Sequence, residues 1–402
     1  MSQQEKEQVE RRGGIPRGIA TSGPAVLSYG FRPFFLAAGV YAVIAMAVWI
    51  GALALGWPVG GGYGGTAWHG HELLFGYTAA ALAGFMLTAI PNWTGRLPVS
   101  GRPLLLLVLL WLAGRLAMAV PDALGMPLTA VLDAAFLPAL AAIAAREIIT
   151  GRNWKNLKIL FALCALSLAN IGFHFAALFD GDLSLWLRVA VAVFVILVTL
   201  VGGRVVPSFT RNWLSRQGGQ RLPRPFGRLD VVAMVAAGLA LALWSVLPER
   251  PETAALAFVA AAAQVLRLLG WRGYLAGAEP LVAVLHVAYL FVPLGLLAVG
   301  LAAFGWISPA SALHVLTAGS IVGMTLAIMT RATLGHTGRK LVASPRTVVA
   351  YSALFIAAVV RPIADLVPDL YLSLLGIAGV AWIGAFSLFV VEYGPMLVRP
   401  RQ

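Results

Sequence analysis

Histidine is the residue type that points most directly to chemistry in this 402-residue sequence, because five of its six histidines lie inside long apolar stretches. An ionisable side chain inside a membrane is costly, and by default it marks an ion path, a ligand or a cofactor. Neutral imidazole is a common ligand of haem iron, copper and zinc. One such histidine is as often a hydrogen-bonded structural residue, but several at one depth favour a metal or haem site. The candidate metal ligands are His69, His71, His174, His286 and His314.

Depth along the predicted helices separates these histidines into two groups. At about 1.5 Å per residue, His174 and His314 lie roughly 25 Å from the basic ends of their helices, and His69 and His71 roughly 35 Å. His286 lies only about 10 Å from that side. Four of the five therefore share one half of the membrane, and among them His71, His174 and His314 are our candidate haem ligands.

The segment Trp68-His69-Gly70-His71-Glu72 carries two of these histidines, two positions apart. On a regular helix such residues point about 200° away from each other, so they cannot both bind one ion. Either Gly70 lets the backbone open, or one imidazole serves a haem and the other a second metal or a structural hydrogen bond. Glu72 either orients a histidine or is an interfacial acid at a helix start, and the sequence slightly favours the second interpretation.

Arginines near the opposite membrane surface form a second candidate group. Arg32, Arg204 and Arg331 could hold haem propionates bidentately. Arginine at this face also follows the membrane charge rule, and this face is the one away from most histidines. His336, nearby in sequence, is expected in a loop. Within the spans, Arg115 and Asp133 could pair with each other or extend toward the surface.

The elements that must position these residues are apolar segments of about 20 residues, the length needed to cross about 30 Å of hydrocarbon. The predicted spans are 34–56, 68–91, 104–120, 127–149, 157–179, 183–206, 229–247, 253–269, 280–304, 311–330, 347–366 and 371–397. The sequence therefore predicts an all-α polytopic membrane domain of about twelve helices over 29–398, with tails at 1–28 and 399–402.

Composition supports a membrane protein and argues against other classes. The chain is 60% hydrophobic and 11% charged, where a soluble globular chain has roughly 25% charged residues. The net charge of +13 does not indicate nucleic acid binding, because the basic residues mark the ends of apolar segments. The single cysteine, Cys164, excludes a disulfide framework within the chain and is expected in the core.

The loops predict the orientation, because Lys and Arg near span ends stay in the cytoplasm. Basic residues gather in the N-terminal segment, in alternate loops and at the C-terminus, whereas the intervening loops carry mainly acids such as Asp122, Asp180, Glu249 and Asp369. Twelve spans with both termini cytoplasmic satisfy this alternation.

A weak internal repeat relates the second, sixth and tenth spans, which end in similar polar segments. Aligning Thr94, Thr210 and Thr330 gives separations of 116 and 120 residues, a period of four spans. Three four-helix units around a pseudo-threefold axis would have this period.

Five motifs in order together resemble the NnrS family over about residues 25 to 395. They are Tyr29-Gly30-Phe31-Arg32-Pro33-Phe34-Phe35, Trp68-His69-Gly70-His71-Glu72, Pro91-Asn92-Trp93-Thr94-Gly95, the run from Gly202 to Thr210, and the run from Met329 to Gly338. The resemblance implies a bacterial inner-membrane protein that binds haem and copper and takes part in the response to nitric oxide and nitrosative stress.

Two questions stay open at the level of sequence. An open axial position on a haem iron would permit ligand binding or haem-dependent redox chemistry with nitric oxide. Two histidines on one iron would instead favour electron transfer or sensing. The sequence does not choose between them, so catalysis and the redox partner are unknown. The alternative function is a metal-free secondary transporter, which twelve spans and internal repeats would also suit.

Overall fold

The computed structural model describes residues 23–402, and in that range twelve helical segments are long and apolar enough to cross a membrane. The predicted all-helical architecture is confirmed, and the described residues form no strand. Most predicted boundaries are correct to within about three residues. The predicted tail at 1–28 lies mostly outside the described residues.

In chain order, the spans are α2 (Phe31–Leu55), α3 with η3 and α4 (Gly65–Thr94), α5 (Gly101–Ala119), α7 with α8 (Met126–Thr150), η4 with α9 (Trp154–Leu178), α10 (Leu183–Arg216), α11 (Arg228–Val246), α12 with η5 (Pro251–Leu275), α13 (Pro280–Ala303), α14 with η6 and α15 (Pro309–His336), α16 (Pro345–Ala364), and η7 with α17 (Pro368–Val398).

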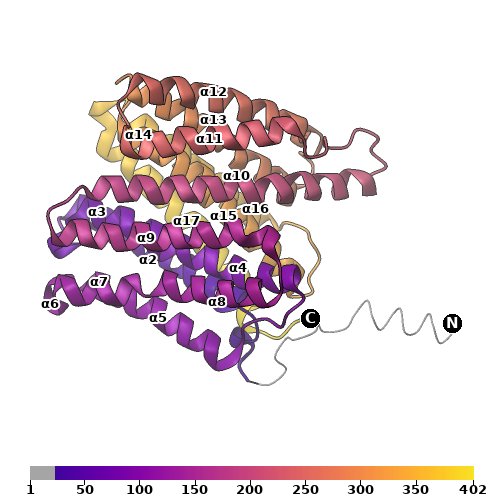
Figure 1. Ribbon diagram of the computed structural model, residues 1–402, viewed down its shortest axis with the longest axis horizontal. Helices are drawn as coiled ribbons and strands as arrows, with labels where there is room; N and C mark the ends of the chain where they lie inside the picture. The colour runs from indigo at the N-terminus through magenta and orange to yellow at the C-terminus, as the bar shows by residue number, and fades with distance from the viewer. Residues whose placement is uncertain (1–22) are drawn as a thin grey trace.

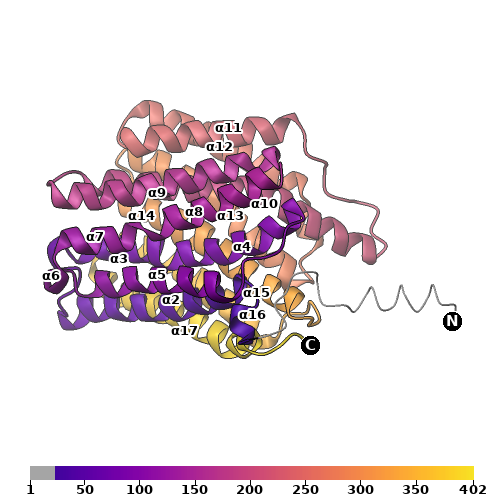
Figure 2. The same ribbon diagram turned by 60° about the horizontal axis from the view of Figure 1, so that its bottom comes forward.

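The helices run side by side as one bundle, with α10 between two groups (Figures 1 and 2). Helices α11 and α13 pack against α10, α12 packs against both α11 and α13, and α9 also packs against α10. The first and last spans, α2 and α17, are also neighbours, so the two ends of the chain meet within the bundle.

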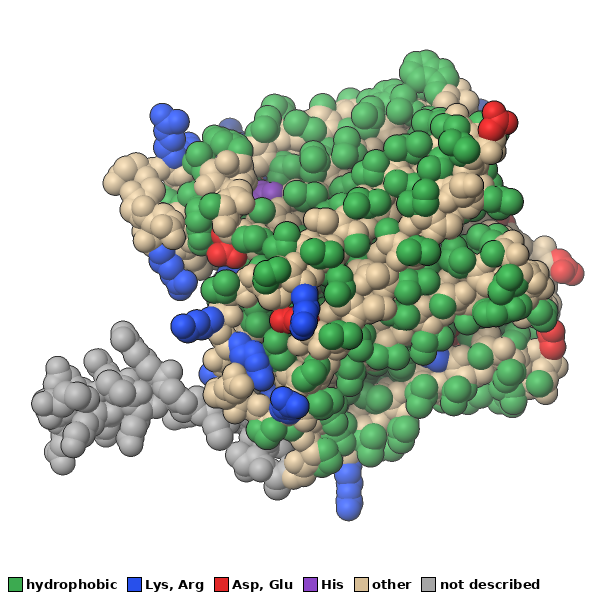
Figure 3. Space-filling model, turned by 180° about the vertical axis from the view of Figure 1, so that it is seen from behind, with side chains coloured by type: hydrophobic (Ala, Val, Ile, Leu, Met, Phe, Trp, Pro, Cys, Tyr) green, Lys and Arg blue, Asp and Glu red, His purple; other side chains and the backbone are tan. Residues whose placement is uncertain are grey.

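Burial divides the spans into inner and outer helices. In the second, sixth, ninth and tenth spans, 61 to 83% of an apolar 18-residue stretch is buried inside the bundle, against 39 to 50% in the other spans. Outer helices expose large apolar side chains such as Leu106, Phe161 and Leu372, as expected for contact with lipid. Figure 3 shows hydrophobic side chains over the middle of one face, with most of the visible Lys and Arg near one end.

Two expectations about single residues are wrong. His336 is the last residue of α15 (Gly323–His336) and not a loop residue, because the helix continues beyond its apolar part and packs the imidazole near the rings of Tyr29 and Phe31. Cys164 is exposed on α9 (Leu157–Leu178), since it faces outward among lipid-facing side chains.

The sixth span is the one whose length differs most from the prediction. Helix α10 continues ten residues past the predicted end at Val206, through Pro207 to Arg216. Its last turns are polar and basic, so hydropathy alone ends the span too early. The helix therefore extends out of the apolar layer and carries Arg204 and Arg211 along that end of the bundle.

Two spans contain a π-helical segment directly after a histidine. Segment η3 (Glu72–Thr78) follows His71, and η6 (Val315–Val322) follows His314. A π turn re-aims side chains and leaves some backbone groups without their usual partners, and such turns are frequent at functional sites. In η3, the indole of Trp111 donates to the carbonyl of Gly76 at 3.0 Å.

The three spans of the suspected repeat meet at the centre of the bundle. They line one small apolar cavity of about 80 Å³, to which η3 and α4, α10, and η6 and α15 all contribute. Their threonines Thr94, Thr210 and Thr330 each donate to the carbonyl four residues earlier. The sixth span lacks the π segment, so the second and tenth are the more alike.

Arg32, at the start of the first span, binds the end of the last span. Its Nη1 donates to the carbonyls of Leu397 at 3.0 Å and Arg399 at 2.6 Å in the last turn of α17 (Tyr371–Val398), where helix carbonyls otherwise lack partners.

We expect Arg32→Met to lower the free energy of unfolding by about 2 to 3 kcal/mol, because charged hydrogen bonds to buried carbonyls are lost. Thermal unfolding in detergent, followed by tryptophan fluorescence, measures the change. Arg102→Met, at an exposed arginine, is the control. An unchanged midpoint for Arg32→Met would contradict the capping role.

Candidate metal centre

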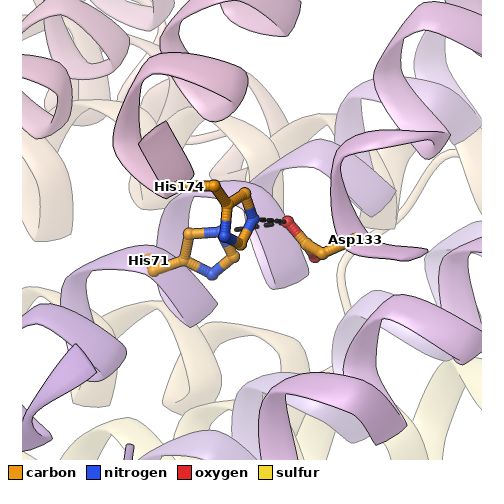
Figure 4. A group of neighbouring side chains, drawn as sticks. All are labelled: His71, Asp133 and His174. Atoms are coloured by element: carbon orange, nitrogen blue, oxygen red, sulfur yellow. Dashed lines mark hydrogen bonds and ion pairs between the residues drawn. The ribbon is translucent and has the colours of Figure 1, made fainter. Parts of the chain in front are cut away.

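Three side chains from three spans converge inside the bundle (Figure 4). His71 ends α3 (Gly65–His71), Asp133 lies on α7 (Met126–Ala134), and His174 lies on α9. Asp133 Oδ2 is 3.1 Å from Nε2 of His71 and 2.8 Å from Nε2 of His174. All three residues are buried, and their ligand atoms lie within 4.8 Å of one another. This spacing leaves room for one ion between them.

The surroundings of His71 favour a positive charge at this point, which a second proton on the imidazole or a metal ion would supply. Its Nδ1 lies 2.8 Å from Oε1 of Glu72, and its Nε2 lies 2.9 Å from Oδ1 of Asn170. The orientation of the Asn170 amide is fixed, because its Nδ2 donates to Asp133 at 2.9 Å. Both ring nitrogens of His71 therefore face oxygen acceptors, and a neutral imidazole has only one N–H to donate.

Arg115 on α5 links the two carboxylates of the site. Its Nη1 donates to Glu72 Oε1 at 2.5 Å and its Nη2 pairs with Asp133 Oδ1. Gly76 admits this guanidinium, because a Cβ there would lie 2.7 Å from Nη1. One positive and two negative charges leave a net charge of −1, in an interior where uncompensated charge is expensive.

The ligand candidates are held by partners on their other ring nitrogens. Glu72 also accepts from Tyr41, and the hydroxyl of Tyr63 lies 2.9 Å from Nδ1 of His174. Burial raises the pKa of Tyr63 to about 12, so its hydroxyl stays protonated at neutral pH. Such partners fix the orientation of metal-binding histidines, and the carboxylate of Glu72 also favours the tautomer of His71 with its proton on Nδ1. Glu72 is thus a buried partner of His71, and the interpretation as an interfacial acid is wrong.

His69 points to a different place from His71, as the helix geometry required. Its ring stacks on Trp49 at 4.5 Å, and it lines a cavity of about 220 Å³ together with His314. Nδ1 of His69 is buried without a hydrogen-bond partner among the described residues. Nδ1 of His314 lies 2.7 Å from the carbonyl of Ala310, which leaves its Nε2 for a ligand. Arg361 and Trp382 also line this cavity.

The remaining predicted site residues are dispersed. His286 is hydrogen-bonded to Thr210 at 2.8 Å and packs on Trp271, apart from the other histidines. Arg331 lies over the ring of Phe209 at 4.0 Å, and Arg204 contacts Asn156. With Arg32 at the end of α17, the three arginines do not meet around one ligand.

From the sequence, His71 and His174 were predicted ligands and pairing of Arg115 with Asp133 was one of two possibilities, but these residues were not predicted to form one site. Asn170 and Tyr63 were missed, since an asparagine in a span and a loop tyrosine carry no motif. Asn170 could have been found from its spacing, because it precedes His174 by one helical turn and therefore lies on the same face of the helix.

Fold and site together define a polytopic membrane protein with a buried histidine–aspartate centre. The family model described as NnrS protein matches residues 25–401, nearly the whole chain. The chain therefore belongs to the NnrS family, as its five motifs predicted. No curated protein matches the chain.

We expect Arg115→Met to lower the free energy of unfolding by about 3 to 5 kcal/mol, because it leaves Glu72 and Asp133 buried without their cation. Arg346→Met is the control, since Arg346 is 66% exposed and pairs with Glu392 at the surface. That change should cost less than about 1 kcal/mol. Equal midpoints of thermal unfolding for the two variants would contradict the charge-compensation role.

Proposed function

We propose that the protein is a haem- and copper-binding inner-membrane protein of the bacterial response to nitric oxide, with copper bound by His71, Asp133 and His174. The supporting observation is the convergence of these three side chains, with His71 facing oxygen acceptors at both nitrogens. Family membership supports the two metals and the link to nitric oxide.

The donor set fits copper. Two imidazole nitrogens and one carboxylate oxygen are ligands that copper accepts, and copper binds such sites more strongly than other divalent first-row metals. A cation also offsets the net charge of −1 left by Arg115, Glu72 and Asp133. In this proposal Glu72 and Tyr63 orient the two histidines, and Arg115 keeps the carboxylates charged and in place.

The cavity of His69 and His314 is the place we propose for haem. His69 Nδ1 lacks a partner among the described residues, and both histidines come from inner spans. The cavity has a volume of about 220 Å³, below the roughly 300 to 1,000 Å³ of typical ligand pockets, so it would hold part of a haem. The group of His71 and His174 is too tight for a porphyrin, and we therefore assign it to an ion.

When bound, haem iron and copper supply redox-active sites that can take up nitric oxide. The protein residues supply orientation, charge compensation and an apolar surrounding. The distribution of basic residues supports the proposal that both ends of the chain face the cytoplasm, which places the histidine cluster toward the periplasm.

The experiment is metal analysis and visible spectroscopy of protein purified from cells supplied with haem and copper. We expect His174→Ala to lose most of the copper and keep the Soret band, and His314→Ala to lose the Soret band and keep the copper. His286→Ala, at a buried histidine outside both sites, is the matched control and should keep both. Addition of nitric oxide to the reduced wild-type protein should shift the Soret band.

Three results would contradict this assignment. Full copper retention in His174→Ala would rule out the histidine–aspartate centre as the copper site. Full haem retention in His314→Ala would rule out the proposed haem site. Loss of both metals in His286→Ala would place the chemistry at the other end of the bundle. A wild-type protein without metal or Soret band would favour the secondary transporter.

A further inference from the structure

A pocket lined by four basic side chains lies at the end of the bundle opposite His71 and His174. It has a volume of about 550 Å³ and is formed by the start of α9, the later part of α10, the following loop and α11. Its basic residues are Lys158, Arg204, Arg211 and Arg224. Neither the metal centre nor the haem cavity uses this pocket.

The positive charge of the pocket is largely uncompensated. Among the described residues, Lys158, Arg204 and Arg211 form no salt bridge. Arg224 pairs at 3.3 Å with Asp230, which is buried and is also bound by Arg267 at 3.0 Å. Like charges held together in this way are unfavourable unless an anion joins them.

The geometry directs these cations toward one ligand. Arg211 donates to the carbonyl of Pro223 at 2.8 Å, which ties the loop to α10 and brings Arg224 to the pocket. Gly203 and Pro207 also line the pocket, and neither carries a long side chain. Of the α10 residues in this wall, Pro207, Ser208 and Arg211 lie in the part of the helix beyond the predicted end of the span.

The apolar part of the lining indicates which anion is bound. Leu200, Met234 and Phe226 share the pocket with the four cations, and Phe226 is 61% exposed. The pocket lies where the spanning helices α9 and α11 begin, the part of a span that is expected near the lipid headgroups. A free phosphate would use only the cations, whereas a phospholipid would place its phosphate on the cations and its acyl chains against the apolar wall.

We propose that this pocket binds the headgroup of an anionic phospholipid. Arg204 and Lys158 contact the phosphate, Arg211 and Arg224 complete the positive surface, and Phe226 packs against the lipid chains. Bound lipid would hold α9, α10 and α11 together at this end, where a long loop separates α10 from α11. The proposal does not depend on the assignment of copper or haem.

Native mass spectrometry of the full chain in detergent tests the proposal, with phosphatidylglycerol and phosphatidylcholine of identical acyl chains as probes. We expect phosphatidylglycerol to bind saturably and more tightly than phosphatidylcholine. Lys158→Gln/Arg204→Gln should weaken that binding about thirty-fold, since each basic residue near the membrane surface contributes about fivefold. Lys158→Gln alone, at an exposed side chain, should weaken it about fivefold.

The matched control is Arg216→Gln/Arg221→Gln, which removes two exposed arginines of the same end that do not line the pocket. This variant should bind phosphatidylglycerol as the wild type does. Equal loss of binding in the two double variants, or equal affinity for both lipids, would overturn the proposal. If inorganic phosphate displaced phosphatidylglycerol completely at the same concentration as the lipid, the pocket would be a free-anion site, and the proposal would also be overturned. Unchanged haem and copper contents in Lys158→Gln/Arg204→Gln would separate this pocket from the cofactor sites.

Discussion

The buried charge of Arg115 between Glu72 and Asp133 is the interaction on which the proposed centre depends. These side chains lie among apolar helices, where an isolated ion would be severely destabilised. The guanidinium joins spans two, three and four by charged hydrogen bonds, and His174 and Asn170 add the fifth span through Asp133. Since the two carboxylates outnumber the arginine, the cluster retains a demand for one more positive charge. A metal ion would supply that charge, as would a second proton on His71.

Helix geometry explains why one short segment serves two sites. His69 and His71 point apart, so that one lines the cavity shared with His314 and the other meets Asp133. The π segment that begins at Glu72 changes the direction of the following turn, and Gly76 lets Arg115 approach the backbone. A π segment also follows His314 on the tenth span.

The twelve spans could be predicted because each is a long apolar run, and the depth of the histidines followed from the rise of a helix. The sequence could not show which histidines face each other, because rotation of one helix against another depends on packing of the whole bundle. Glu72 was misjudged for the same reason, since an acid near a helix start looks interfacial until its partners Tyr41 and Arg115 are placed. The π segments could not be predicted from the sequence, because no residue pattern distinguishes η3 or η6 from ordinary helix. Arg32, by contrast, lies in a motif that suggests a ligand, but it contacts the end of α17.

The central claim is that a metal ion sits between His71, Asp133 and His174. X-ray absorption spectroscopy at the copper edge of the purified wild-type protein tests it most directly, because it reports the atoms bound to the metal. We predict a first shell of nitrogen and oxygen at about 2.0 Å, with the outer-shell scattering of two imidazoles and no sulfur. In His174→Ala, any residual copper should show the scattering of one imidazole fewer. A sulfur ligand, or an unchanged imidazole signal in that variant, would contradict the claim.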